Sequence, residues 1–272
     1  MARAIYISRP LLMPYAVMQK SLTPPSVEQL KAAFRDVPGL TEVDAHILGQ
    51  DAFGILVKHF TFENATALQS ALAAQGVETE VLEEGLLQEL PPVRFVTHVD
   101  CAPEALMIYD PLGRSFPLEW NQILLIAAGK VAMDEFKKVR TQALVVQHSQ
   151  HETSETVMTK EQWNDRLLLE IVVSRAVLRY SITADKCPGL LFEYLGTRRT
   201  EDLANNFALL AQDLIRFAPQ AAINQGAYYL RENCEKPFYY HSKSAFYEEM
   251  TWLLWQLSLP SDKSNEAQGT TS

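Results

Sequence analysis

The sequence predicts a two-domain α+β protein. In the first ninety residues, a helix pattern, a glycine and a strand pattern occur twice in succession. After Pro91 and Pro92 the chain becomes a series of strand-like segments that ends in a long amphipathic helix. Adjacent prolines disfavour both helix and central strand, so they suit a connector between domains. With 272 residues, the chain is long enough for two domains of ordinary size.

The first region has the element order β-α-β-β-α-β. Ser26 follows two prolines and suits a helix N-cap, and Gly39 and Gly76 suit the ends of two helices. The strand segments are rich in β-branched and aromatic residues. The predicted elements are a strand at 2–12, a helix at 27–38, strands at 41–48 and 55–60, a helix at 63–76 and a strand at 77–83.

The two halves of this region are similar to each other. The stretch LKAAFRDVPGLTEV, residues 30–43, and the stretch LQSALAAQGVETEV, residues 68–81, both give a helix, a glycine and a polar-alternating strand. Paired βαβ halves of this kind resemble the ferredoxin-like plan. The resemblance implies that residues 1–90 form a four-stranded antiparallel sheet with two helices on one face, leaving the other face uncovered.

The second region begins with strand-like segments joined by a tight turn. Asp110, Pro111 and Gly113 suit the turn, since proline fixes φ and glycine tolerates positive φ. Pro117 restricts its segment to an edge or bulged strand. The predicted strands are 93–99, 105–110, 114–120, 121–131, 166–174, 176–185 and 190–196, followed by a helix at 201–217.

This order resembles the bacterial pleckstrin-homology-like domains. Those domains carry a strand, a turn with glycine and arginine, and an Ile-Pro-Leu step into the next strand. The matching residues here are Gly113, Arg114, Phe116, Pro117, Leu118 and Ile123, with two extra residues before the isoleucine. The resemblance implies that residues 93–218 form a bent barrel with a closing C-terminal helix, and that the hairpin around the turn is barrel wall. Trp120 beside this turn is expected to anchor the hairpin to the core.

The last part is predicted to be a helical extension over 219–258 and a polar, disordered tail over 259–272. The second helix of the extension has an apolar stripe, and Tyr247, Trp252 and Trp255 add aromatic surface around it. Such residues are enriched at interfaces. Two interpretations remain open for these three side chains: they pack on the chain's own domains, or they form an interaction surface for a partner or a second copy.

Composition excludes two classes of partner. The formal net charge is −9, with 24 Lys and Arg against 33 Asp and Glu. Nucleic-acid-binding domains usually carry a basic patch, and the densest basic run here is KKVR at 137–140. The acidic charge also disfavours anionic membrane surfaces, and no run reaches the roughly 18 apolar residues of a membrane span. We therefore expect neither a nucleic-acid partner nor a membrane span, and lipid recognition by the barrel is disfavoured.

Cysteine usage and the N-terminus indicate a cytoplasmic protein. The three cysteines, Cys101, Cys187 and Cys234, are widely spaced and form no CxxC motif, which is typical of reduced thiols. The apolar N-terminus carries arginines and prolines within residues 3–14, unlike a signal peptide.

Residues with catalytic or metal-binding chemistry form only incomplete sets. His46 and His59 lie near Asp44 and Glu63 in sequence, without paired acid/base spacing. His98 and Cys101 have ligand-like spacing, and so do His148, His151 and Glu152 in the polar stretch 147–165, which is predicted to be a solvated loop. Structural zinc normally needs four ligands, and the HExxH arrangement is absent. We expect no catalytic residues, no metal and no cofactor.

The function expected from these features is that of a non-catalytic intracellular binding, adaptor or signalling-type protein, with a protein partner or a second copy as its ligand. A homodimer is expected, because two-fold dimers are the commonest closed assemblies. The alternative is an enzyme of unassigned class that uses a cleft between the domains. Against it, the sequence has no nucleophile elbow, phosphate loop or complete metal set.

Overall fold

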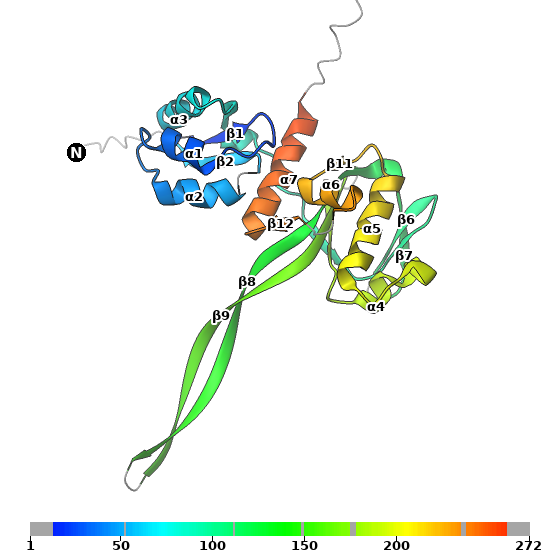
Figure 1. Ribbon diagram of the computed structural model, residues 1–272. Helices are drawn as coiled ribbons and strands as arrows, with labels where there is room; N and C mark the ends of the chain where they lie inside the picture. Colours follow the sequence, from blue (N-terminus) through cyan, green and yellow to red (C-terminus); the bar gives the residue numbers. More distant parts are fainter. Residues whose placement is uncertain are drawn as a thin grey trace, which may run out of the picture. The chain divides into compact units, whose positions relative to one another are not determined.

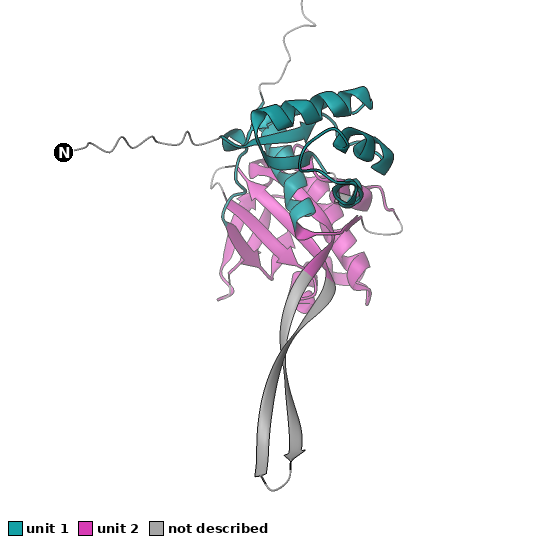
Figure 2. Ribbon diagram, turned by 90° about the vertical axis from the view of Figure 1, so that its left-hand side faces the viewer, with its two compact units in different colours: residues 1–92, 244–272 teal, residues 93–243 magenta. Residues whose placement is uncertain are grey.

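The computed structural model describes residues 13–51, 53–110, 112–147, 150–174, 178–234 and 238–259. At Asp51, at 134–147 and at 150–164 only the backbone is described. The chain divides into two compact units, residues 1–92 with 244–272, and residues 93–243 (Figure 2). The division after Pro92 lies at the predicted connector. The predicted separate extension, 219–258, is divided between the two units.

Unit 1 contains a three-stranded antiparallel sheet in the order β2-β1-β3. Its strands are β1 (Tyr15–Gln19), β2 (Ile55–Phe60) and β3 (Thr79–Glu83). Its helices are α1 (Val27–Phe34), α2 (Glu42–Asp51), α3 (Phe62–Ala74) and, from the end of the chain, α7 (Lys243–Ser258). None of the helices within the described ranges has the length and apolarity that a membrane crossing requires.

The predicted strand at 41–48 is wrong, because these residues form helix α2. Thr41 and Asp44 close the start of the helix: the Thr41 N–H donates to the Asp44 carboxylate at 2.8 Å, and the Asp44 N–H donates to the Thr41 hydroxyl at 3.3 Å. Ala45 and Leu48, one helical turn apart, then reach the apolar core. The described part of unit 1 therefore has three strands rather than four, and the strand predicted at 2–12 lies outside the described residues.

Both faces of this sheet are buried. Along β1, Val17 points into a cluster with residues of α1, α2 and α3, whereas Ala16 and Met18 point to the opposite face. There they pack with Ile55 and with Trp252 and Trp255 of α7. The uncovered sheet face that the sequence predicted is therefore covered by the chain's own last helix.

A hydrogen bond from Trp252 and an ion pair from Glu248 fix α7 to the sheet. The Trp252 indole N–H donates to the Gln19 carbonyl at 2.7 Å. The Gln19 side-chain carbonyl accepts the N–H of Gly54 at 2.9 Å, and the Gln19 N–H donates to the Gly54 carbonyl at 2.7 Å. Lys58 of β2 adds an ion pair with Glu248 of α7 at 2.9 Å. Gly54 has a φ of +88°, and a Cβ there would lie 2.4 Å from the Trp252 ring. The indole packs directly on this backbone.

Unit 2 contains a six-stranded sheet and a three-stranded sheet (Figure 1). The six-stranded sheet has the path β11-β8-β9-β10-β4, with β12 also paired to β8. Its strands are β4 (Val93–Val96), β8 (Ile123–Gln147), β9 (Gln150–Val173), β10 (Leu178–Thr183), β11 (Ala222–Ile223) and β12 (Tyr239–Tyr240). The smaller sheet consists of β5 (Val99–Cys101), β6 (Ala105–Tyr109) and β7 (Ser115–Glu119). The helices are α4 (Pro188–Leu191), α5 (Leu203–Phe217) and α6 (Gln225–Arg231), with a 3-10 helix, η3 (Glu193–Arg198).

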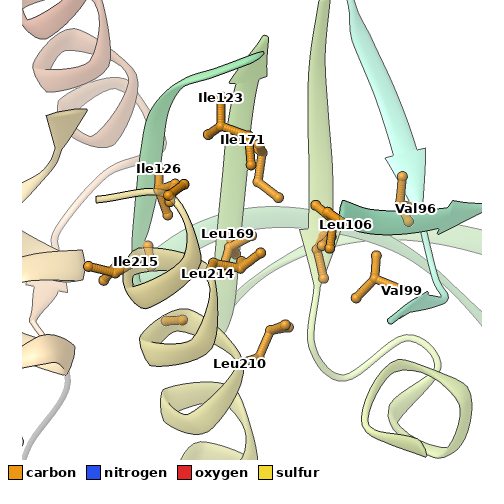
Figure 3. Packing of buried hydrophobic residues seen from close by; sticks show 14 of the residues in the cluster. Val96, Val99, Leu106, Ile123, Ile126, Leu169, Ile171, Leu210, Leu214 and Ile215 are labelled. Carbon is orange, nitrogen blue, oxygen red and sulfur yellow. The ribbon is translucent and has the colours of Figure 1, made fainter. Parts of the chain in front are cut away.

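One apolar core joins the two sheets to α5. Figure 3 shows Leu210 and Leu214 of α5 beside Ile126, Leu169 and Ile171 of the larger sheet. Val96, Val99 and Leu106 contribute to the same core from β4, β5 and β6. The predicted helix at 201–217 is confirmed, and so is the edge position of Pro117, because β7 lies at the edge of the smaller sheet. Trp120 is buried in this core, as expected of an anchor.

The predicted barrel and the predicted strand at 190–196 of unit 2 are wrong. Within the described residues neither sheet closes into a barrel, so the β6–β7 hairpin is part of the open three-stranded sheet rather than a barrel wall. The segment 190–196 is helical instead of extended: it spans the end of α4, whose first residue is Pro188, and the start of η3, which is interrupted by a non-helical kink at Gly196 (φ +54°). The α+β class itself is confirmed.

The polar stretch predicted as a loop, 147–165, belongs mainly to strand β9, which pairs with β8 throughout. Strand backbones can form their ladder whatever the polarity of their side chains. His148 lies outside the described residues, and nothing is described of the side chains of His151 and Glu152. The metal constellation considered for these residues therefore stays a sequence hypothesis.

Asn224 connects helix α6 to β8. Its side-chain carbonyl accepts the N–H groups of Ala128 and Ala227, both at 2.9 Å, and its amide donates to the Tyr240 hydroxyl at 2.7 Å and to the Ala128 carbonyl at 3.2 Å. The backbones approach closely here, since a Cβ on Gly226 would lie 1.8 Å from the Ala128 oxygen. One buried amide thus caps α6 and holds it on the sheet.

We predict that Gly54→Ala destabilises unit 1 by about 2–4 kcal/mol, combining left-handed backbone strain with overpacking against Trp252. Gly39→Ala is the matched control, because Gly39 has a similar φ of +89° and open space around it. It should cost only about 1 kcal/mol. Urea denaturation followed by hydrogen exchange of unit 1 peptides measures both variants. Equal losses would show that the indole does not pack on this backbone.

We also predict that Asn224→Ala destabilises unit 2 by about 2–4 kcal/mol, because it removes the cap and leaves buried groups unpaired. Asn205→Ala, at an exposed position of α5, should change stability by less than about 0.5 kcal/mol. Hydrogen exchange of unit 2 peptides across a denaturant series gives both values. A loss no larger than that of the control would contradict the anchoring role.

Candidate functional site

The aromatic residues proposed as an interaction surface are mostly core. Trp252 and Trp255 are only 7% and 6% exposed, and both pack against the sheet of unit 1. Tyr247 is half-buried, with its ring 5.6 Å from that of Phe246. Of the two interpretations of these side chains, the structure favours packing within the chain for both indoles.

The histidines of unit 1 do not form an acid/base pair with their sequence neighbours. His46 is exposed on α2, and Asp44 bonds to Thr41, which lowers the pKa of the Asp44 carboxyl. His59 contacts Glu84, with 3.1 Å between its Nδ1 and the carboxylate, instead of Glu63. Glu63 is exposed in the first turn of α3, where a carboxylate favours the helix dipole.

His98 and Cys101 face different surroundings. The His98 ring stacks on Tyr109 at 3.9 Å, and the Tyr109 hydroxyl donates to Asp100 at 2.7 Å. Cys101 instead packs against the core of unit 2. Across the described ranges, no three His, Cys, Asp or Glu residues come together in a way that could hold a metal ion.

A buried carboxylate that sequence reasoning missed organises a polar cluster in unit 2. Asp213 of α5 is 4% exposed and accepts two hydrogen bonds from Arg198, at 2.7 and 3.1 Å. Arg216 and the Tyr194 hydroxyl each donate to it at 3.1 Å. Only the Asp213–Arg216 pair, three residues apart on one helix, could have been found from the sequence.

Two titratable groups in and beside this cluster, the Cys101 thiol and the Tyr194 phenol, are kept protonated. Burial raises the pKa of the Cys101 thiol to about 12, and burial also raises the pKa of Tyr194. The hydrogen bonds to Asp213 raise the pKa of Arg198. A neutral thiol and a neutral phenol are poor nucleophiles and poor bases near pH 7. The hydrogen bonds of Asp213 with Tyr194 and Arg198 tie η3 to α5.

An open depression of about 750 Å³ lies beside this cluster, lined by residues including Arg199, Thr200 and Asn206. The buried Asn206 amide does not point into it as a ligand group, since its oxygen accepts from Thr200 N–H at 2.8 Å and its nitrogen donates to Thr200 O at 2.7 Å. The amide stabilises the turn before α5.

The edge strand β4 combines exposed apolar and cationic side chains. It pairs in parallel with β10 on one side and ends the sheet path among the described strands. Val96 faces the core, whereas Phe95 and Val93 are 68% and 39% exposed. Lys186 places its ammonium 5.5 Å from the centre of the Phe95 ring. Exposed aromatic side chains on an unpaired edge are unusual, because such edges attract other strands.

We predict that Cys101 resists alkylation at pH 8, because its raised pKa gives about a thousandfold less thiolate than an ordinary thiol with a pKa of 9.0. Cys234 is exposed and serves as the internal control. Peptide mass spectrometry after iodoacetamide treatment of the folded protein should find Cys234 modified and Cys101 intact. Equal modification would contradict the burial of the thiol.

No family model matches this chain, and neither a curated protein nor a solved structure matches it.

Proposed function

We propose that the protein is a non-catalytic binding protein of the adaptor type, which receives an extended segment of a partner protein along the edge of β4. The observation that carries this proposal is that, among the described strands, β4 pairs only with β10, together with the 68% exposure of Phe95. The proposal extends the sequence-based expectation of a binding protein and replaces the aromatic helix α7 with β4 as the contact surface.

The physical basis is strand addition. A strand paired on one side directs part of its N–H and C=O groups away from the sheet, and an extended peptide can pair with these groups. Main-chain hydrogen bonds would supply affinity, and side chains at alternate positions would supply specificity. Phe95 and Val93 lie on the same face of β4, two residues apart, so together they offer an apolar contact for alternate side chains of the added segment.

The enzyme alternative has less support. The most chemically varied cluster in the described part of unit 2, around Asp213, has its carboxylate bonded to two arginines and a tyrosine. The neighbouring thiol is held neutral by burial. These residues contribute to the packing of α5, whereas Phe95 makes no comparable contribution to the core and remains exposed.

A peptide library tests the proposal. The probe is a displayed set of eight-residue peptides, with apolar residues at alternate positions and Asp, Glu, Lys, Arg or Ser between them. The full-length protein should retain a subset of these peptides. Phe95→Ser should weaken binding of the retained peptides at least about tenfold, because a buried aromatic contact at an interface is worth more than about 1.4 kcal/mol.

Leu112→Ser is the matched control, since Leu112 is a 79% exposed apolar residue of the same unit, on the turn after β6. It should change the affinity less than twofold. Both variants should melt within about 2 °C of the parent, because both side chains are exposed. Absence of any retained peptide, or equal effects of the two substitutions, would sink the proposal.

A further inference from the structure

We infer that the segment bound along β4 is acidic, with carboxylates on both faces of the added strand; this inference rests on the proposed function. The observation behind it is a pair of exposed cations at the edge, Arg94 and Lys186, in a chain whose formal net charge is −9. Both cations lie beside Phe95: Arg94 precedes it in β4, and the Lys186 ammonium lies over its ring.

The two cations belong to opposite faces of the edge. Arg94 and Phe95 are consecutive in β4, so their side chains point to opposite faces of the sheet. Lys186 lies over the ring of Phe95, so it is on the face of the sheet opposite to Arg94. An added strand also alternates its side chains between the two faces. A peptide with polar residues on each face would bring one carboxylate near Lys186 and another near Arg94.

Two carboxylates near this edge, Asp185 and Glu170, form ion pairs with other cations. Asp185, next to Lys186 in sequence, pairs with Arg166 at 2.6 Å. Glu170 of β9 pairs with Arg179 of β10 at 3.0 Å. Among the described residues, neither Arg94 nor Lys186 forms an ion pair within 4.0 Å. A partner carboxylate would therefore provide charge compensation that the described residues do not supply.

The same charges disfavour a second copy as the occupant. Pairing two β4 strands edge to edge would bring two copies of Arg94 and of Lys186 to one interface. Like charges across neighbouring strands are destabilising, whereas opposite charges are stabilising. Charge complementarity thus favours an acidic partner protein over self-association at this edge.

The peptide library described above also tests this inference. In low salt, the peptides retained by the full-length protein should contain at least about fivefold more Asp and Glu than Lys and Arg, from two favourable cross-strand pairs. The double variant Arg94→Glu with Lys186→Glu should reverse this preference. The control double variant, Lys20→Glu with Arg35→Glu, makes the same change in net charge at exposed positions of unit 1 and should keep the acidic preference.

Three outcomes would overturn the inference, and they are distinguishable. A retained pool with equal acidic and basic content, still dependent on Phe95, would leave strand addition standing and remove the charge preference. Absence of any retained pool would remove the proposed function as well. A dimer in sedimentation experiments that dissociates in the Phe95→Ser variant, but not in Leu112→Ser, would identify a second copy as the occupant.

Discussion

The sheet of unit 1 is apolar on both faces, while the helices between its strands cover only one of them. Residues of α1, α2 and α3 enclose Val17, and the opposite face, with Met18 and Ile55, depends on α7. A thin sheet with an exposed apolar face would be a site of aggregation. The start and the end of the chain are therefore bound into one unit, and the indole of Trp252, hydrogen-bonded to Gln19, is the contact at which they meet.

The elements that could be predicted from sequence are those whose pattern and packing agree. α5 has a regular apolar stripe, and every position of that stripe reaches the core, so its prediction is confirmed. The strand predicted at 41–48 was wrong because the alternating pattern of these residues fits a strand as well as a helix. The Thr41–Asp44 cap and the packing of Ala45 stabilise the helix α2 instead. The strand predicted at 190–196 was wrong because Pro188, at the first position of α4, favours a helix start that outweighs the strand-like composition of the segment.

The features proposed to matter for function were less accessible to sequence reasoning. Asp213 accepts hydrogen bonds from Arg198 and Tyr194, which lie some fifteen or more residues away in the sequence. No local sequence pattern predicts contacts over such a separation. The segment around Phe95 was correctly predicted to be extended. Whether such a strand lies inside a sheet or at its edge depends on which strands pair with it, and the parallel pairing with β10 joins residues more than eighty positions apart. Exposure of Phe95 follows from that pairing.

Because unit 2 is inserted between β3 and α7, unit 1 cannot be completed until unit 2 has been synthesised. About 170 residues separate Glu83 from Trp252, which at about 5–20 residues per second corresponds to roughly ten to thirty seconds of translation. During that interval the three strands of unit 1 can pair, but Met18 and Ile55 have no helix to cover them. Unit 2 emerges in one continuous piece and can fold first. The ribosome-bound chain thus holds a half-covered sheet, with an apolar face suited to chaperone binding, until α7 has been synthesised.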